Sequence, residues 1–186
     1  MTSLNKICLH WTAGANSPCQ LDLNSYHYCV DKLGRIYPGT NTPEDNINCY
    51  DGKYAKHCGG GNTGCIGLSA CGMAGFYFKK KKTKYLITQK QIDDSLCTMA
   101  AYLSIKYGIP INKNTVFTHY EFDQKRPDGK REDKIDIAYL PYESNLSPSE
   151  VGNYLRRKVN WYRDKIKQGK YKFEKKGNYY EFVRIN

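Results

Sequence analysis

The chain of 186 residues is long enough for one domain with a sizeable hydrophobic core and too short for two ordinary domains. Its 29 lysines and arginines exceed its 18 aspartates and glutamates by 11, so the surface potential is positive and should attract polyanions. No segment approaches the roughly 20 consecutive apolar residues of a membrane-spanning helix, which argues against an integral membrane segment.

The N-terminal sequence MTSLNKICLHWTAG has no charged-then-apolar leader with a cleavage site, so we expect no signal peptide. A chain made without a leader begins in a reducing cytoplasm, and its eight cysteines are therefore expected to be free thiols. No C-x-x-C pair occurs, which argues against a structural zinc knuckle.

The first half of the chain is rich in predicted strands, which are short apolar runs bounded by turn residues. They cover residues 5–11, 28–30, 35–37, 65–70 and 115–119. Asp31-Lys32-Leu33-Gly34 joins the second and third strands and predicts a hairpin. The lysine-rich stretch 79–84 is interpreted as the solvated tip of a loop.

Two helices are predicted from their capping residues and apolar spacing. The first starts at Thr88, which has a glutamine three residues later, and its apolar stripe stops before Gly108. The second starts at Ser147, has a proline in its first turn and ends near Gly169. Beyond Gly169, basic and aromatic residues are spaced as in a short hairpin with its turn at 175–178.

This mixture of strands and helices predicts an α/β fold. We expect a single domain with a central mixed β-sheet, flanked by helices and followed by a short basic C-terminal extension. Residues 1–145 are expected to form the main domain. Residues 146–186 are expected to add a helix and a basic aromatic hairpin that are packed on this domain or appended to it.

Two of the predicted strands carry a histidine near their end. His10 lies in the strand 5–11, and His119 lies at the polar end of the strand 115–119. A single buried histidine is usually a core residue whose ring bonds to backbone, but two strand-end histidines far apart in sequence favour one metal site. Catalytic zinc sites typically have three protein ligands and one open position, so a third ligand is expected.

Candidates for the third ligand lie in the polar segment after His119. Asp136 is flanked by Ile135 and Ile137, which could hold the segment against the sheet, and Lys134 lies two residues earlier on the same side. Other aspartates of this segment remain alternatives, and they are Asp123, Asp128 and Asp133.

Four segments of the chain form a further pattern. They are His10-Trp11-Thr12-Ala13, Tyr26-His27-Tyr28 with the following hairpin, the glycine-rich stretch 57–67, and Thr118-His119 with Lys134-x-Asp136. In order and local chemistry these segments resemble the zinc-dependent N-acetylmuramoyl-L-alanine amidases, a family that includes phage endolysins, bacterial muropeptide amidases and animal peptidoglycan recognition proteins. The resemblance covers roughly residues 5–140. Some bacterial members carry a glutamate base where this chain has Ser69, so the resemblance is to the tyrosine-plus-lysine members.

The resemblance implies a zinc ion held by His10, His119 and Asp136, with residues 1–145 as the zinc amidase catalytic domain. Only Asp136 has the Lys-x-Asp context of the family, although its spacing from His119 is longer than usual. Tyr26 matches the family tyrosine near the reacting water, and Lys134 matches the lysine that helps to stabilise the oxyanion.

The loop after His57 has two interpretations. The resemblance gives His57 and Asn62 substrate contacts, with the glycines of 59–64 letting the backbone approach a glycan; the alternative is a simple turn. His27 is expected to be structural, because strand alternation points it away from Tyr26.

The activity that the resemblance implies is hydrolysis of the amide bond between N-acetylmuramic acid and L-alanine in bacterial peptidoglycan. The absence of a leader and the +11 charge favour a monomeric phage or prophage endolysin, made in the cytoplasm and acting on the cell wall without a nucleic-acid partner. The alternatives are a cytoplasmic muropeptide-recycling amidase and a non-catalytic peptidoglycan-binding module. A cysteine amidase is disfavoured because Cys97 lies in the middle of a predicted helix and the other cysteines lie in strands or loops.

Overall fold

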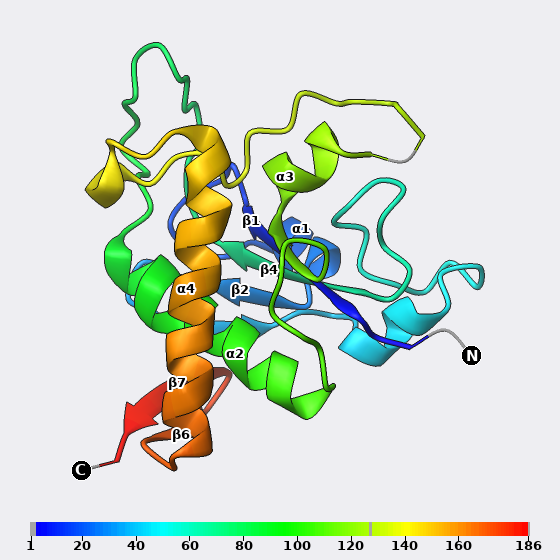
Figure 1. The fold of residues 1–186 in the computed structure, drawn as a ribbon, viewed down its shortest axis with the longest axis vertical. Helices are drawn as coiled ribbons and strands as arrows, with labels where there is room; N and C mark the ends of the chain where they lie inside the picture. Colours follow the sequence, from blue (N-terminus) through cyan, green and yellow to red (C-terminus); the bar gives the residue numbers. More distant parts are fainter. Residues whose placement is uncertain (1–2, 127, 186) are drawn as a thin grey trace.

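A seven-stranded mixed β-sheet forms the centre of the molecule, with helices in front of it and behind it (Figure 1). This computed structural model describes residues 3–126 and 128–185. The strands are β1 (Lys6–Trp11), β2 (Tyr28–Val30), β3 (Ile36–Pro38), β4 (Cys65–Ala70), β5 (Val116–Thr118), β6 (Tyr171–Lys176) and β7 (Tyr179–Arg184). The α-helices are α1 (Gln20–Ser25), α2 (Cys97–Lys106), α3 (His119–Gln124) and α4 (Pro148–Lys167). Shorter helical turns are η1 (Pro43–Ile47), η2 (Lys90–Leu96) and η3 (Pro141–Glu143). The predicted α/β fold is confirmed.

The sheet has the strand order β5-β1-β4-β2-β3-β7-β6. The first four strands run parallel, and the last three pair antiparallel. Ile36 of β3 pairs with Tyr180 of β7, so the predicted C-terminal hairpin continues the central sheet. Among the described residues, no helix has both the length and the apolar character needed to cross a bilayer.

Strand β1 shows why a buried strand carries a histidine. Ile7, Leu9 and Trp11 point into the main core, which α2 and α4 cover. Because side chains alternate along a strand, Cys8 and His10 point to the opposite face, where a smaller cluster of cysteines and Phe117 lies. The histidine therefore belongs to a separate, more polar layer behind the sheet.

The two predicted helices are confirmed, with one difference in the first. Thr88 and Gln91 form the expected capping box, with Thr88 N 3.0 Å from Gln91 Oε1 and Gln91 N 3.2 Å from Thr88 Oγ1. The first seven residues are wound as the π-helical turn η2 before α2 continues. Helix α4 begins with the predicted capping pair of Ser147 and Glu150. The eight cysteines form no disulfide bond within the described part of the chain.

His119 does not lie in a strand, so that prediction was wrong. Strand β5 ends at Thr118, and His119 is the first residue of α3. Thr118 Oγ1 accepts from Glu121 N at 3.2 Å, and Thr118 N donates to Glu121 Oε2 at 3.0 Å. This capping box ends the strand and turns the histidine toward the layer behind the sheet.

A partly buried ion pair ties α4 to the start of α3. Arg156 Nη1 lies 2.9 Å from Glu121 Oε2, and Arg156 Nη2 lies 2.8 Å from Glu121 Oε1. Arg156 Nη1 also donates to the carbonyl of Val116 in β5, at 3.0 Å. Arg156 of α4 thus binds both β5 and Glu121, the residue that forms the capping box at the start of α3.

Candidate active site

Two imidazole rings converge on one carboxylate at the carboxyl-terminal ends of β1 and β5. His10 Nδ1 lies 2.8 Å from Asp136 Oδ2, and His119 Nδ1 lies 3.2 Å from the same oxygen. All three residues are buried. The structure brings together the three residues that were predicted to bind a metal ion, with ligand atoms within 4.8 Å of one another.

The donor set suits zinc. Two imidazole nitrogens and one carboxylate oxygen are ligands that zinc accepts, and three protein ligands leave one position for water or substrate. His119 and Asp136 line an open cleft with a volume of about 580 Å³, so that fourth position has access to solvent. We conclude that these residues fit a catalytic zinc site.

A second group of possible ligands shares His10. It consists of Cys8, His10 and His57, again with ligand atoms within 4.8 Å of one another. Cys8 is fully buried, and both ring nitrogens of His57 lie at hydrogen-bonding distance from other groups. Cys8 does not line the cleft, whereas His119 and Asp136 both do, so the group with Asp136 is the better candidate for catalysis.

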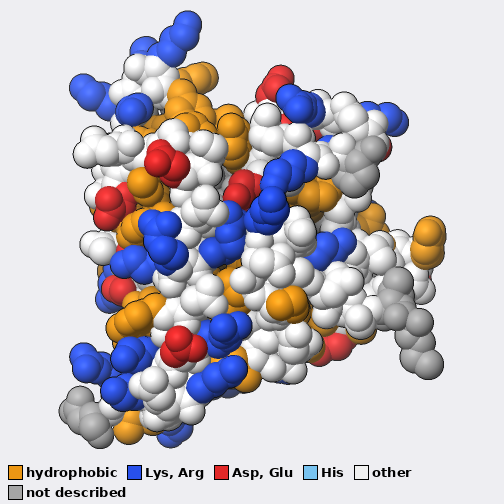
Figure 2. Space-filling model, in the orientation of Figure 1, with side chains coloured by type: hydrophobic (Ala, Val, Ile, Leu, Met, Phe, Trp, Pro, Cys, Tyr) orange, Lys and Arg blue, Asp and Glu red, His pale blue; other side chains and the backbone are white. Residues whose placement is uncertain are grey.

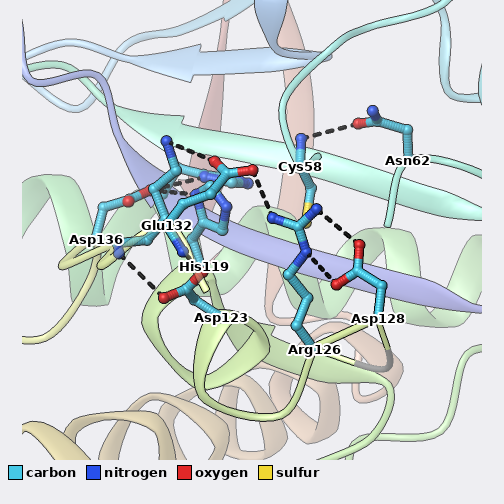
Figure 3. A network of polar contacts seen from close by, with 10 residues as sticks. Cys58, Asn62, His119, Asp123, Arg126, Asp128, Glu132 and Asp136 are labelled. Carbon is cyan, nitrogen blue, oxygen red and sulfur yellow. Dashed lines mark hydrogen bonds and ion pairs between the residues drawn. The ribbon is translucent and has the colours of Figure 1, made fainter. Parts of the chain in front are cut away.

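The long segment between His119 and Asp136 is folded out and back, which explains how so distant an aspartate reaches the site. Asp123 in α3 accepts hydrogen bonds from the backbone N–H groups of Glu132 at 2.7 Å and Lys134 at 3.2 Å (Figure 3). The carbonyl of Asp136 accepts from Tyr120 N at 2.7 Å. These bonds close the base of the loop and place Asp136 beside His119.

The other aspartates of this segment have different partners. Asp123 binds the backbone of the returning chain, as described above. Asp128 pairs with Arg126, whose guanidinium lies between Asp128 and Glu132 in Figure 3, with an Nη2–Oδ2 distance of 3.0 Å. Asp133 is exposed and lines the cleft, but it does not join the group formed by the two histidines.

The electrostatics of the cluster favour a cation. Burial lowers the pKa of His119, but its hydrogen bonds to Asp136 and Cys58 outweigh this effect and raise the pKa to about 9. Burial raises the pKa of the Asp136 carboxyl, yet the bonds from His10 and His119 bring the pKa below its usual value. A carboxylate that stays ionised in a buried position needs positive charge beside it, which a proton or a metal ion provides.

Tyr26 and Lys134 also line the cleft, as the predicted roles require. The Tyr26 ring lies 5.1 Å from the His10 ring, centroid to centroid, and burial raises the pKa of its phenol, so Tyr26 stays neutral. Lys134 Nζ is half-exposed and lies 3.1 Å from Glu132 Oε2. Ser69 is fully buried in register with His10, and within the described part of the chain its hydroxyl has no hydrogen-bond partner.

The loop after His57 is shaped by contacts within the protein. Asn62 does not line the cleft; its Oδ1 accepts from the backbone N–H groups of His57 at 3.1 Å and Cys58 at 2.8 Å (Figure 3). A Cβ atom on Gly61 would lie 2.6 Å from the ring of Phe122, so the glycine permits close packing against α3. His57 borders the cleft but is only 6% exposed.

Cys58 is a neighbour of the cluster that the sequence did not single out. Its thiol bonds to Cys8 and His119, and these contacts lower its pKa to about 5 against the opposing effect of burial. The only sequence signal was its position directly after His57.

His27 has a structural role, as expected. Its Nδ1 accepts from the backbone N–H of Gly67 at 2.9 Å, so the ring proton is assigned to Nε2, which donates to Asn46 Oδ1 at 3.0 Å. Burial, which disfavours the charged form of the ring, lowers the pKa of His27 to about 4.

This low pKa predicts a loss of stability in acid. An unfolded histidine has a pKa of about 6.5, so between pH 6.5 and 4 the unfolded chain binds the proton more readily than the folded protein. The stability is therefore present above about pH 6.5, and about 2–3 kcal/mol of it is lost as the pH falls toward 4. Urea denaturation at pH 7 and 4.5 measures this loss. His27→Asn, which keeps an acceptor for Gly67 N–H but does not titrate, should show a smaller loss; an equal loss would contradict the assignment to His27.

Comparison with known proteins agrees with this geometry. A comparison with curated proteins gives no significant match. A family model described as N-acetylmuramoyl-L-alanine amidase matches residues 1–136, a stretch that extends from the N-terminus to Asp136 and includes each of the site residues above. The chain therefore belongs to the N-acetylmuramoyl-L-alanine amidase family.

Proposed function

We propose that the protein is a zinc-dependent amidase that hydrolyses the bond between N-acetylmuramic acid and L-alanine in peptidoglycan, and that it acts as a phage or prophage endolysin. The observation that carries this proposal is the convergence of His10, His119 and Asp136 beside the cleft. Membership of the amidase family supports the reaction class.

The residues of the cleft divide the chemical tasks among them. His10, His119 and Asp136 would hold the metal ion. When bound, zinc supplies a Lewis acid that makes water nucleophilic near neutral pH and polarises the scissile carbonyl. Tyr26 stays a neutral phenol and can donate a hydrogen bond into the cleft. Lys134 places a positive charge at the cleft wall, where it would stabilise the negative oxygen that develops during amide hydrolysis.

The mixed polar and aromatic lining of the cleft is compatible with a junction between sugar and peptide. Residues of the segments 73–77 and 133–136 line it. Both segments belong to loops at the same end of the sheet (Figure 1). Tyr77 offers an exposed aromatic ring, and Lys56 offers a cation.

The endolysin role is supported by charge. Figure 2 shows lysine and arginine side chains spread over the face that carries α4, with several acidic side chains among them. Bacterial walls are polyanionic, so a net charge of +11 would hold the enzyme on them. We propose that residues 1–145 carry the chemistry and that residues 146–186 add to this attraction.

The reaction is tested with intact sacculi and a soluble muropeptide. We expect purified protein to hold about one zinc ion per chain, to expose new L-alanine amino groups, and to release no new reducing sugar. Less than half an equivalent of zinc, or reducing sugar alone, would contradict the proposed reaction.

Salt separates the endolysin role from muropeptide recycling. Raising the ionic strength from about 0.1 M to 1 M shortens the screening length from about 10 Å to 3 Å, so clearing of sacculi should fall steeply. Turnover of the small muropeptide should change little. Trimming the chain after Gly169 should lower wall binding more than muropeptide turnover. Activity on muropeptides alone, with sacculi untouched at every ionic strength, would assign the protein to recycling.

A further inference from the structure

The ring of His57 lies directly behind His10, on the side away from Asp136. His10 Nε2 is 3.1 Å from His57 Nδ1, and His57 Nε2 is 3.2 Å from the carbonyl oxygen of Cys65 in β4. Both nitrogens of His57 are therefore engaged inside the protein. This arrangement differs from the substrate contact that the family resemblance implied for His57.

The protein makes room for this ring and holds it. A Cβ atom on Gly67 would lie 2.4 Å from His57 Cγ, so only glycine at this position of β4 leaves space for the imidazole. Asn62 binds the backbone N–H of His57 and so fixes the start of its side chain. The ring position is thus set from two sides.

When His10 binds a metal ion through Nδ1, the hydrogen bonds from His10 to His57 and from His57 to Cys65 have only one consistent direction. We assign the ring protons from these two bonds. The carbonyl of Cys65 can only accept, so the proton of neutral His57 lies on Nε2. His57 Nδ1 is then an acceptor and requires a proton on His10 Nε2. The lone pair of His10 Nδ1, which faces Asp136, is left free for a metal ion.

We propose that His57 is a positioning residue that holds His10 as the tautomer protonated on Nε2 and fixes the orientation of its ring. The inference rests on the proposed zinc site. Groups that accept the second ring proton of a metal-binding histidine typically contribute 10–100-fold to metal affinity or activity. His57 is expected to act on the metal through His10 and not through contact with substrate.

Two variants test the inference. His57→Leu removes the acceptor, whereas His57→Asn keeps an amide oxygen close to the place of Nδ1. We expect His57→Leu to weaken zinc binding about 10–100-fold in a chelator competition, and His57→Asn to stay within a few-fold of wild type. Thermal denaturation of the metal-free proteins controls for folding. In the zinc-loaded wild type, ¹⁵N NMR of the imidazole rings should show the His10 proton on Nε2, a readout that does not depend on either variant.

The outcomes are distinguishable. Wild type that binds zinc together with a His57→Leu variant that binds it equally tightly would overturn the inference and leave the proposed function intact. Equal losses in the two variants, or a His10 proton on Nδ1 in the zinc-loaded protein, would also overturn it. Wild type that binds no zinc would overturn both the proposed function and the inference.

Discussion

Replacing Asp136 by alanine is expected to remove most of the bound zinc and to lower the rate of amide hydrolysis about 1000-fold. Both imidazole rings converge on one oxygen of this carboxylate. A site with three protein ligands that loses one of them no longer holds its metal ion tightly. Lewis acid catalysis contributes several kcal/mol to transition-state stabilisation, and each 1.36 kcal/mol corresponds to tenfold in rate. Metal content after dialysis and turnover of a soluble muropeptide measure the two effects.

Asp128→Ala is the matched control, because Asp128 lies in the same loop and its partner is Arg126. It should leave zinc content and turnover close to those of wild type. The result that contradicts the site is the reverse: full zinc in Asp136→Ala and loss of zinc in Asp128→Ala, or in Asp133→Ala. The third ligand would then come from another part of the loop.

Arg156→Met is expected to cost about 3 kcal/mol of stability and to lower the melting temperature by about 10 °C. The substitution leaves the partly buried Glu121 carboxylate and the Val116 carbonyl without their cationic partner. Glu121 also caps α3, so the start of the helix that carries His119 should loosen. Thermal and urea denaturation of the metal-free protein measure the loss.

The neighbouring Arg157 gives the control for this substitution. It lies on the same helix but is exposed, so Arg157→Met should change stability by no more than about 0.5 kcal/mol. Equal effects of the two substitutions would show that the ion pair between Arg156 and Glu121 is not what stabilises this part of the protein.

Local signals in the sequence were sufficient for most of the fold. The alternation in β1 and the turn at 31–34 have causes that lie within a few residues, and so does the capping box at Thr88. The capping box at Thr118 is equally local. It was not predicted because the apolar pattern of the preceding strand continues up to His119. Where a strand pattern and a helix-start pattern overlap, the boundary between the two elements is uncertain by one residue. Here that residue is His119, which belongs to the candidate site.

The candidate site depended more on contacts between distant segments. His10 and His119 could be found because each lies at the carboxyl-terminal end of a strand of the parallel set, His10 within β1 and His119 directly after β5. The flanking isoleucines favoured Asp136 over its neighbours, but the choice needed the family resemblance, since the bonds of Asp123 to the returning chain are invisible in a pattern of residue types. The role of Asn62 could not be foreseen for a similar reason, because an amide that stabilises a turn and one that binds a glycan are the same residue in a sequence.

The ion pair between Arg156 and Glu121 also bears on how such an enzyme can be exchanged between genomes. The stretch that matches the amidase family ends at Asp136, twenty residues before the arginine that holds the capping residue of α3. Recombination that moved only the matching stretch would separate Glu121 from its partner and uncover the face of the sheet that α4 protects. The segment needed for folding is therefore longer than the segment that matches the family model. We expect hybrid proteins joined after α4 to fold and hybrid proteins joined at residue 136 not to fold.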